Sequence, residues 1–367
     1  MKFIKPIYVI IGTRAQFIKM APLLRKMLEQ DIPYQLIYTA QHQENIDEIL
    51  ETYQLPPADI VMFKHEEAKT KVSFSHWFVS VFMYVLLNTK KYLPNPGIVL
   101  THGDTFTAWM AALMGKLAKC TVCHVESGLR SFNIFSPFPE EISRLLTFRL
   151  SDIYFCPNKT AIRNLKNFKG EKINTEGNTL LDGVRFALSQ NEKRRYHFQD
   201  SPYAVVSLHR YENIFTSRFT DKIFPILTRI SEKYKLVFTL HPTTRERLRS
   251  LGKFEELDNN VNIILHERFS FVDWINICNK AEFVITDGGS NQEELSYLGV
   301  PTMLFRFETE RDEGLSENIV LTKLDKELIN NFLTNYLMYR TSKNLPDFSP
   351  SQKIINNLIK IDSTSYL

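Results

Sequence analysis

The most restrictive feature of this chain is an alternation between short, continuously apolar runs and longer segments with helical spacing. Uninterrupted apolar runs are typical of strands that are covered on both faces, and therefore of parallel sheets with helices on each side. The predicted strands are 7–11, 34–38, 97–101, 121–125, 153–156, 203–207, 236–240, 261–265, 283–286 and 302–305. The predicted helices are 17–30, 45–53, 107–118, 218–233, 271–278, 292–298 and 353–361.

The pattern predicts two successive domains. The chain has 367 residues, and a domain has roughly 150. A charged and polar stretch, Ser189–Arg195, interrupts the alternation, which then resumes. We therefore predict an α/β protein with two Rossmann-like, doubly wound domains, residues 1–186 and 187–367. The last helix is expected to cross back to the first domain.

Composition excludes several classes of protein. Hydrophobic residues make up 44% and charged residues 23% of the chain, the balance of a soluble globular protein. The net charge of +4 is too small and too evenly spread to indicate a nucleic-acid partner. The start of the chain lacks the long apolar run of a signal peptide. The longest apolar stretch, Trp77–Asn88, falls short of the ~20 residues that span a bilayer, and it predicts a buried helix.

The cysteines do not indicate a metal site or a disulfide framework. Cys120 and Cys123 form a CxxC inside a predicted buried strand, and no second CxxC follows. We expect no metal site and a reducing, cytoplasmic compartment.

Polar residues gather directly after the predicted strands. In open parallel sheets, ligands bind beyond the carboxyl ends of the strands. The segments at these ends are Gly12–Arg14, Thr101–Asp104, Glu126–Gly128, Ser207–Arg210, Leu240–His241 and Asp287–Ser290. If the two domains face each other, glycines, cations and carboxylates meet in one central cleft.

Two of these segments suit an anion. Gly12–Arg14 lies at a strand-to-helix turn, where backbone N–H groups and a guanidinium can hold phosphate. Asp287–Ser290 opens a helix with two glycines that allow close approach to the backbone. Neither segment is a GxxxxGK[ST] loop or a GxGxxG turn, so ATP hydrolysis and a dinucleotide cofactor lose support.

Three carboxylates indicate proton transfer. Asp104 and Glu126 each follow a predicted strand, and Glu140 opens a helix. Any one of them could merely cap a helix or pair with a cation, but three acids in one place repel one another and suit general acid–base catalysis. His209 and Arg210 after a strand add a proton carrier or a cation from the second domain.

The motifs in their order resemble the non-hydrolysing UDP-N-acetylglucosamine 2-epimerase family. The resemblance extends over roughly residues 7 to 320. The segments that carry it are GTRAQFIKMAPL, TAQHQENIDEIL, THGDTFTAWMAAL, HVESGLRSFNIFSPFPEEISR, TEGNTLLDGV, SLHRYENI, DGGSNQEELSYLGVPTMLFR and ETERDEG.

This resemblance implies a GT-B-type fold, two Rossmann-like domains facing a central cleft. It also implies a reaction at C2 of a UDP-HexNAc. UDP leaves with loss of the C2 proton to give a 2-acetamidoglucal, and it re-adds after protonation on the other face. No metal and no NAD take part. The resemblance further implies a homodimer and a role in making surface polysaccharide precursors.

The resemblance also implies residue roles. Asp104, Glu126 and Glu140 would transfer protons, assisted by His209. Glu294 would bind the ribose hydroxyls, and Trp274 would stack under uracil. The remaining substrate-binding residues would be Arg14, Lys19, Arg130, Arg210, His241, Gly288, Gly289, Ser290, Thr309, Glu310 and Arg311.

The chain departs from the family pattern in three places. Ala15–Gln16 stands where Pro-Glu is usual, and Gly288 takes the place of a serine, with Ser290 displaced by two residues. The Pro-Gly-Gln expected near Phe63–Glu67 is missing, so substrate-activated regulation is not expected. Three alternatives remain open: a hydrolysing 2-epimerase that releases UDP and free sugar, a GT-B glycosyltransferase, and a non-catalytic nucleotide-sugar-binding protein.

Overall fold

The computed structural model describes residues 3–39, 46–62, 71–134, 139–190 and 195–363, and for 71–81 the backbone only. The chain divides into two compact units. The first unit contains residues 1–183 and 347–367, and the second contains 184–346. Residues 40–45 and 135–138 of the family motifs, and Phe63–Glu67, lie outside the described residues.

The first unit is built on a parallel sheet. Over its described residues the strand order is β3-β2-β1-β4-β5-β6-β7, and every pairing is parallel. The strands are β1 (Ile7–Ile11), β2 (Gln35–Tyr38), β3 (Ile60–Val61), β4 (Ile98–His102), β5 (Thr121–Val125), β6 (Ile153–Cys156) and β7 (Glu171–Asn174). The order reverses between β1 and β4, which makes the gap beyond their carboxyl ends the ligand position typical of such sheets.

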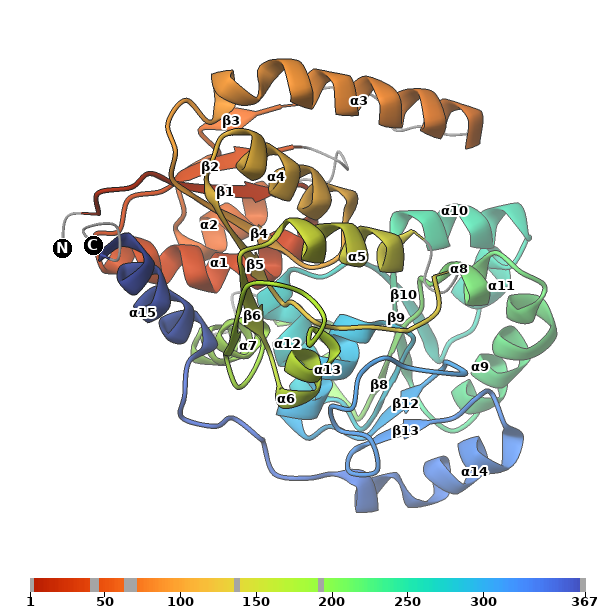
Figure 1. The fold of residues 1–367 in the computed structure, drawn as a ribbon. Helices are drawn as coiled ribbons and strands as arrows, with labels where there is room; N and C mark the ends of the chain where they lie inside the picture. Colours follow the sequence, from red (N-terminus) through yellow and green to blue (C-terminus); the bar gives the residue numbers. More distant parts are fainter. Residues whose placement is uncertain (1–2, 40–45, 63–70, 135–138, 191–194, 364–367) are drawn as a thin grey trace. The chain divides into compact units, whose positions relative to one another are not determined.

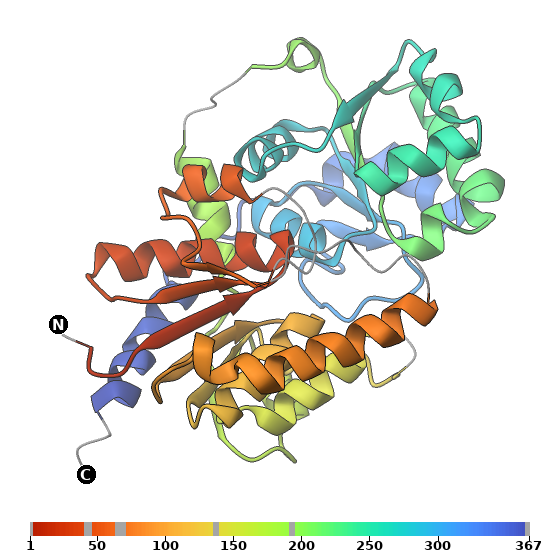
Figure 2. The ribbon, with the colours of Figure 1, turned by 90° about the horizontal axis from the view of Figure 1, so that it is seen from above.

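Helices flank this sheet (Figure 1). They are α1 (Arg14–Glu29), α2 (Asp47–Tyr53), α3 (Lys71–Tyr92), α4 (Phe106–Leu117), α5 (Glu140–Leu150), α6 (Lys159–Asn164), α7 (Leu180–Ser189) and α15 (Pro350–Ser363). Figures 1 and 2 show α15 beside α1, far from it in sequence. Asp182 accepts a hydrogen bond from the Ser351 backbone, and Asp362 accepts bonds from the backbone of Ile4 and Lys5. These bonds attach the C-terminal helix to the first unit.

The second unit repeats the plan. Its parallel strands are ordered β10-β9-β8-β11-β12-β13, with a reversal between β8 and β11. They are β8 (Ala204–Ser207), β9 (Leu236–Leu240), β10 (Ile263–Glu267), β11 (Val284–Thr286), β12 (Thr302–Leu304) and β13 (Ile319–Leu321). The helices are α8 (Tyr211–Ile214), α9 (Phe224–Ser231), α10 (Pro242–Ser250), α11 (Phe254–Asp258), α12 (Phe271–Lys280), α13 (Gly289–Leu298) and α14 (Lys326–Asn335).

The predicted strands are all present, because their side chains are buried on both sheet faces. All of β1 and β4 is buried, and so is all of β9. The sequence analysis missed β3, β7 and β13. All three are edge strands, and all three are partly half-buried or exposed. β7 (EKIN) also lacks a continuous apolar run, and β3 and β13 are only two and three residues long. The predicted helix 218–233 is a turn of π-helix, Phe219–Ile223, followed by α9.

One helix differs from its prediction. Trp77–Asn88 lies in α3 as expected, but the prediction that it is buried is wrong for three of its apolar side chains, Met83, Leu86 and Leu87. Val85 is buried, whereas Leu87 is 77% exposed and Met83 is 47% exposed. Figure 2 shows α3 along the outside of the first unit beside α4. Among the described residues, no helix is both long enough and apolar enough to cross a bilayer.

Gly299 ends α13 in the left-handed region, and this generates a stability prediction. Its φ is +66°, and a Cβ there would lie 2.4 Å from the Thr341 carbonyl oxygen. Gly252 has nearly the same φ, +64°, with nothing within 4 Å. We expect G252A to cost about 1–2 kcal/mol for the left-handed backbone alone. We expect G299A to cost about 2 kcal/mol more because the new methyl group meets backbone. Urea unfolding of both variants measures this difference, and equal losses would contradict it.

His124 in β5 generates a pH prediction. Burial lowers its pKa to about 4. The Gly103 carbonyl only accepts, so the His124 Nε2–H donates to it at 2.7 Å, and Nδ1 accepts from the Ser127 hydroxyl at 2.9 Å. Between pH 4 and 6.5 the unfolded chain therefore binds more protons at this residue than the folded chain does. Its contribution to stability is complete above pH 6.5 and declines as the pH falls toward 4.

Between pH 7.5 and 5, wild type should lose about 2 kcal/mol more unfolding free energy than H124Q, whose side chain does not titrate. Urea unfolding at both pH values tests this. The same loss in both proteins would show that His124 is not held neutral.

Candidate functional site

The turn after β1 depends on a glycine. A Cβ on Gly12 would lie 2.0 Å from the Thr107 hydroxyl oxygen and 2.3 Å from that of Thr39. These two hydroxyls share a buried hydrogen bond of 2.9 Å. Only glycine leaves room for the turn to pass this pair. The turn then leads into α1, where Thr13 is the N-cap and accepts from the Gln16 backbone.

Glu126 is held in a strained backbone conformation between two basic side chains. It follows β5 with φ of +57°, which is uncommon for a residue other than glycine and clusters at functional sites. The Lys19 ammonium donates to both carboxylate oxygens, at 2.8 and 2.7 Å. His102 Nε2 lies 3.1 Å from the same carboxylate. All three residues are buried, so the charge of Glu126 is neutralised inside the protein rather than by water.

Asp104 belongs to a second group of ion pairs, separate from the pair of Lys19 with Glu126. Arg144 of α5 donates to Asp104 at 2.5 Å and to Glu141 at 3.1 Å. Glu141 also accepts from the Arg130 side chain and from the Ser131 backbone. Burial alone would raise the pKa of Glu141, but these donors hold it below its ordinary value. Arg130, Glu141, Arg144 and Asp104 therefore form a row of ion pairs of alternating sign, which links the loop after β5 to Asp104.

The structure places the three predicted carboxylates on neighbouring elements of the first unit. Asp104 and Glu126 follow the adjacent strands β4 and β5, and Glu140 is the half-buried first residue of α5. Arg14, predicted to hold the diphosphate, donates to Glu48 of α2 at 2.8 Å. This ion pair engages one nitrogen of its guanidinium.

In the second unit, Asp287 follows β11 and binds the residues that follow the neighbouring strand β8. It is fully buried, and it accepts from the backbone N–H groups of His209 and Arg210 and from the Asn213 amide. His209 Nδ1 lies 3.4 Å from Asp287, and His241 is a ring neighbour of His209 at 6.1 Å. Desolvation lowers the pKa of His209, opposed by Asp287. His209 is thus expected to be neutral at pH 7.

The predicted phosphate turn lies beside this histidine. Gly288 is the N-cap of α13, and a Cβ there would be 3.1 Å from a His209 ring carbon. Gly289 and Ser290 follow as the half-exposed first residues of the helix. The amino end of a ten-residue helix next to a histidine is favourable for an anion.

Arginine–carboxylate pairs surround the start of α13. Arg311 donates to Glu293 at 2.7 Å, and Thr309 donates to the Gln292 side chain at 2.7 Å. Arg306 donates to Glu310 at 2.8 Å, and Arg210 lies 3.9 Å from Glu310. Burial opposes these two cations, yet they lower the pKa of Glu310 to about 2.

Trp274 and Glu294, predicted to hold uridine, contact each other directly. The Trp274 indole N–H donates to the Glu294 carboxylate at 2.7 Å. Both side chains are buried. This bond fixes the orientation of the carboxylate and of the indole ring at once.

Sequence reasoning missed the partners of the predicted residues. His102, Glu141 and Arg144 were given no role, Gln16 was noted only as a departure from the family pattern, and Asp287 was considered only as part of a phosphate turn. These residues share one signal that could have been used: each lies within a motif, one to four residues from a predicted site residue. The contact that gives each its role joins separate elements, which spacing does not reveal.

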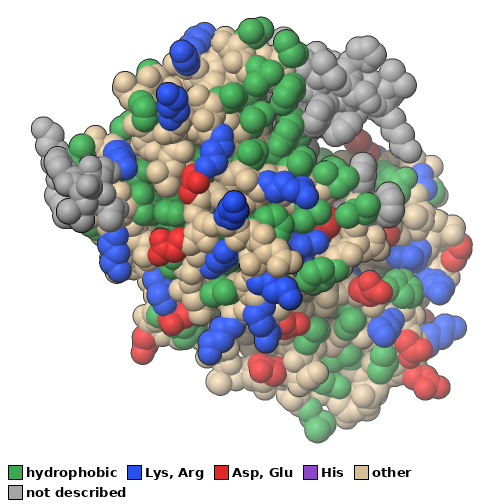
Figure 3. All heavy atoms as spheres, in the orientation of Figure 1, with side chains coloured by type: hydrophobic (Ala, Val, Ile, Leu, Met, Phe, Trp, Pro, Cys, Tyr) green, Lys and Arg blue, Asp and Glu red, His purple; other side chains and the backbone are tan. Residues whose placement is uncertain are grey.

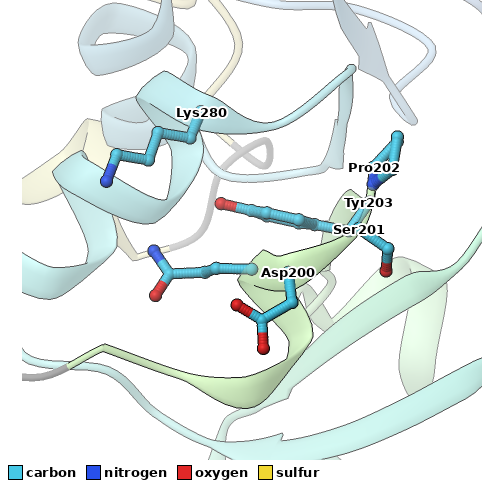
Figure 4. A pocket seen from close by; sticks show the side chains of 6 residues that line it. Asp200, Ser201, Pro202, Tyr203 and Lys280 are labelled. Carbon is cyan, nitrogen blue, oxygen red and sulfur yellow. The ribbon is translucent and has the colours of Figure 1, made fainter.

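A cavity of about 310 Å³ lies elsewhere in the second unit. Figure 4 shows Asp200, Ser201 and Lys280 around it. Its residues precede β8 or end α12, so it is at the amino end of the strand, opposite to His209. Figure 3 shows basic, acidic and apolar side chains on the face of the molecule that it draws.

The cysteines are buried and have free thiols. Burial raises the pKa of Cys120 and of Cys156, which makes both thiols inert. Across the described ranges, no three His, Cys, Asp or Glu side chains are grouped so that they could hold a metal ion.

Solved structures resemble the whole chain. One is a Methanocaldococcus jannaschii UDP-GlcNAc 2-epimerase in complex with UDP-GlcNAc and UDP, at 27% identity and a TM-score of 0.82, covering 97% of this chain and 99% of that one. Another is the Neisseria meningitidis UDP-GlcNAc 2-epimerase bound to UDP-GlcNAc, at 26% identity and 0.83, covering 97% and 100%. These neighbours are GT-B-type proteins, and with the two parallel sheets they confirm the predicted fold class.

Sequence comparisons agree. The chain is 32% identical over 366 residues to a UDP-N-acetylglucosamine 2-epimerase of Methanococcus maripaludis, covering 96% of this chain and 97% of that protein. It is 33% identical over 336 residues to a putative UDP-N-acetylglucosamine 2-epimerase of Thermotoga maritima, covering 87% and 85%. The family model described as UDP-N-acetylglucosamine 2-epimerase matches residues 26–356. On these matches, which extend over nearly its full length, the chain belongs to the UDP-N-acetylglucosamine 2-epimerase family.

Proposed function

We propose that this protein interconverts UDP-GlcNAc and UDP-ManNAc, or a related UDP-HexNAc pair, without net hydrolysis. A base removes the C2 proton, the C1–O bond breaks, and its electron pair leaves with UDP. The resulting 2-acetamidoglucal then takes a proton at C2 on the opposite face. UDP re-adds at C1, so atoms and charges balance without a further reactant.

The observation that carries this proposal is the pair of cation-bound carboxylates at adjacent strand ends. Asp104 is bound by Arg144, and Glu126 is bound by Lys19, with His102 Nε2 at 3.1 Å from the same carboxylate. Proton abstraction and proton return on opposite faces of C2 require two separate groups. In the proposed division of roles, Asp104, Glu126 and Glu140 of the first unit transfer protons, and Lys19 and Arg130 stabilise them.

The second unit is proposed to bind the nucleotide. His209, Arg210 and His241 and the start of α13 (Gly288, Gly289, Ser290) supply donors and cations for a diphosphate. Trp274 and Glu294 are proposed to hold the uridine, since an aromatic face stacks on a base and a carboxylate accepts from ribose hydroxyls. Thr309, Glu310 and Arg311 then bind near the sugar, and Arg14 adds positive charge near the diphosphate.

A homodimer, a cytoplasmic location and a role in surface polysaccharide precursors stay predictions drawn from the family resemblance. Sedimentation of the purified protein tests the first of them.

The outcome of the reaction separates the proposal from its alternatives. Wild-type protein incubated with UDP-GlcNAc in D2O should give UDP-ManNAc that carries deuterium at C2, because the acid that protonates the glucal on the other face carries a deuteron from solvent. NMR of the products measures this. Free sugar plus UDP would indicate the hydrolysing reaction instead. Absence of any reaction until an acceptor is added would indicate a glycosyltransferase.

Removal of one carboxylate tests its role. D104N keeps the shape of the side chain and an oxygen for Arg144, but it lacks a base. We expect kcat to fall by about 10²- to 10⁴-fold, with UDP affinity near that of wild type because the nucleotide is assigned to the second unit. The matched control is D200N, the same change at an exposed pair with Arg195, which should retain wild-type kcat. An active D104N protein would refute the role of Asp104.

A further inference from the structure

Gln16 connects the turn after β1 to the end of β4. It is 2% exposed and occupies the first turn of α1. Its side-chain oxygen accepts from the backbone N–H groups of Gly12 and Thr13, at 2.9 and 3.2 Å. Its side-chain nitrogen donates to the His102 carbonyl at 2.6 Å. One amide therefore bridges the two neighbouring strand ends at the point where the strand order of the first unit reverses.

These contacts require an acceptor and a donor on the same side chain. Backbone N–H groups only donate, so they must face the Gln16 oxygen, and a carbonyl only accepts, so it must face the nitrogen. A carboxylate can replace the oxygen but has no hydrogen for His102. An aliphatic side chain replaces neither. The glutamate that is usual at this position in the family can supply the hydrogen bond to His102 only when it is protonated, whereas Gln16 supplies it at any pH.

The His102 carbonyl lies two residues before Asp104. Between them, Gly103 has a φ of +69°, donates to the Val125 carbonyl at 2.9 Å and accepts from His124 at 2.7 Å. The Gln16 bond is a further constraint on this short segment. His102 itself contacts Glu126. The hydrogen bond from Gln16 to the His102 carbonyl therefore restrains the positions of both Asp104 and Glu126.

We propose that Gln16 is a positioning residue, whose neutral amide locks the end of β4 to the turn after β1 and so fixes Asp104 and Glu126 for proton transfer. The inference rests on the proposed function for its kinetic readout. It does not need that function for its structural readout, which is the exchange of backbone amides near Gly103.

The test compares Q16E and Q16M with wild type. In Q16E the acceptor for Gly12 and Thr13 remains, but the donor to His102 is lost, so at pH 8 kcat should fall roughly 10- to 100-fold with KM within about threefold. In Q16M both contacts are lost, so kcat should fall and KM should rise. Q352E is the matched control, because Gln352 pairs with Gln30 away from the strand ends, and it should behave as wild type.

The pH profile separates positioning from general damage. Once protonated, the carboxyl group introduced by Q16E can donate to His102, so the kcat of Q16E relative to wild type should recover toward pH 6. Burial favours this neutral form. Other titratable groups stand on the same and adjacent elements, namely Arg14 and Lys19 on α1, His102 and Asp104 at β4, and His124 and Glu126 at β5. They are common to both proteins, so the ratio of rates isolates the new carboxyl group.

Amide hydrogen exchange gives the second readout. At pH 8, peptides that cover residues 99–106 should exchange faster in Q16E than in wild type, and Q352E should match wild type. Unchanged exchange with unchanged kcat in Q16E would overturn the proposal, and so would a pH-independent loss of the same size in Q16E and Q16M. If Q16E does not fold, wild-type kcat and KM in Q16M would overturn it. If wild type does not epimerise, the proposed function fails and the exchange data alone decide this inference.

Discussion

The site depends on pairing buried carboxylates with buried cations at the ends of parallel strands. Removing one partner of such a pair leaves an uncompensated charge, at a cost of about 3–5 kcal/mol. Lys19 and Glu126 form the clearest example, with both side chains less than a tenth exposed. The pairing means that neither member can be moved or removed without disturbing its partner. The left-handed backbone of Glu126 shows that the fold tolerates strain to keep this geometry.

Both units have the same arrangement of strands and polar residues. Each has a parallel sheet in which the strand order reverses, and each places its polar residues beyond the strands on either side of that reversal. In the first unit these residues are mainly acids paired with cations. In the second unit the equivalent position holds a fully buried aspartate, Asp287, that gathers backbone and side-chain donors around His209. The repeated plan gives one unit suited to proton transfer and another suited to an anion.

The strands and the fold class were accessible from the sequence because strands that are buried on both faces have continuous apolar runs. The family was accessible because its motifs occur in order along the chain. Edge strands such as β7 were not, since solvent on one side removes that run. The exposed face of α3 was missed for a related reason: apolar character alone does not show which side meets protein. Within the candidate site, motif order pointed to Asp104 and Trp274. It did not point to Arg144 or to the bond between Trp274 and Glu294, because these contacts join elements far apart in sequence.

The proposed reaction breaks the C1–O bond of the substrate and returns UDP to C1 after the C2 proton has moved. Positional isotope exchange tests it most directly, with substrate that carries ¹⁸O in the oxygen between C1 and the β-phosphorus. If the C1–O bond breaks and UDP returns, the label in recovered substrate should spread from the bridging position to the non-bridging oxygens of the β-phosphate. A label that stays in the bridge while epimerisation proceeds would contradict the account.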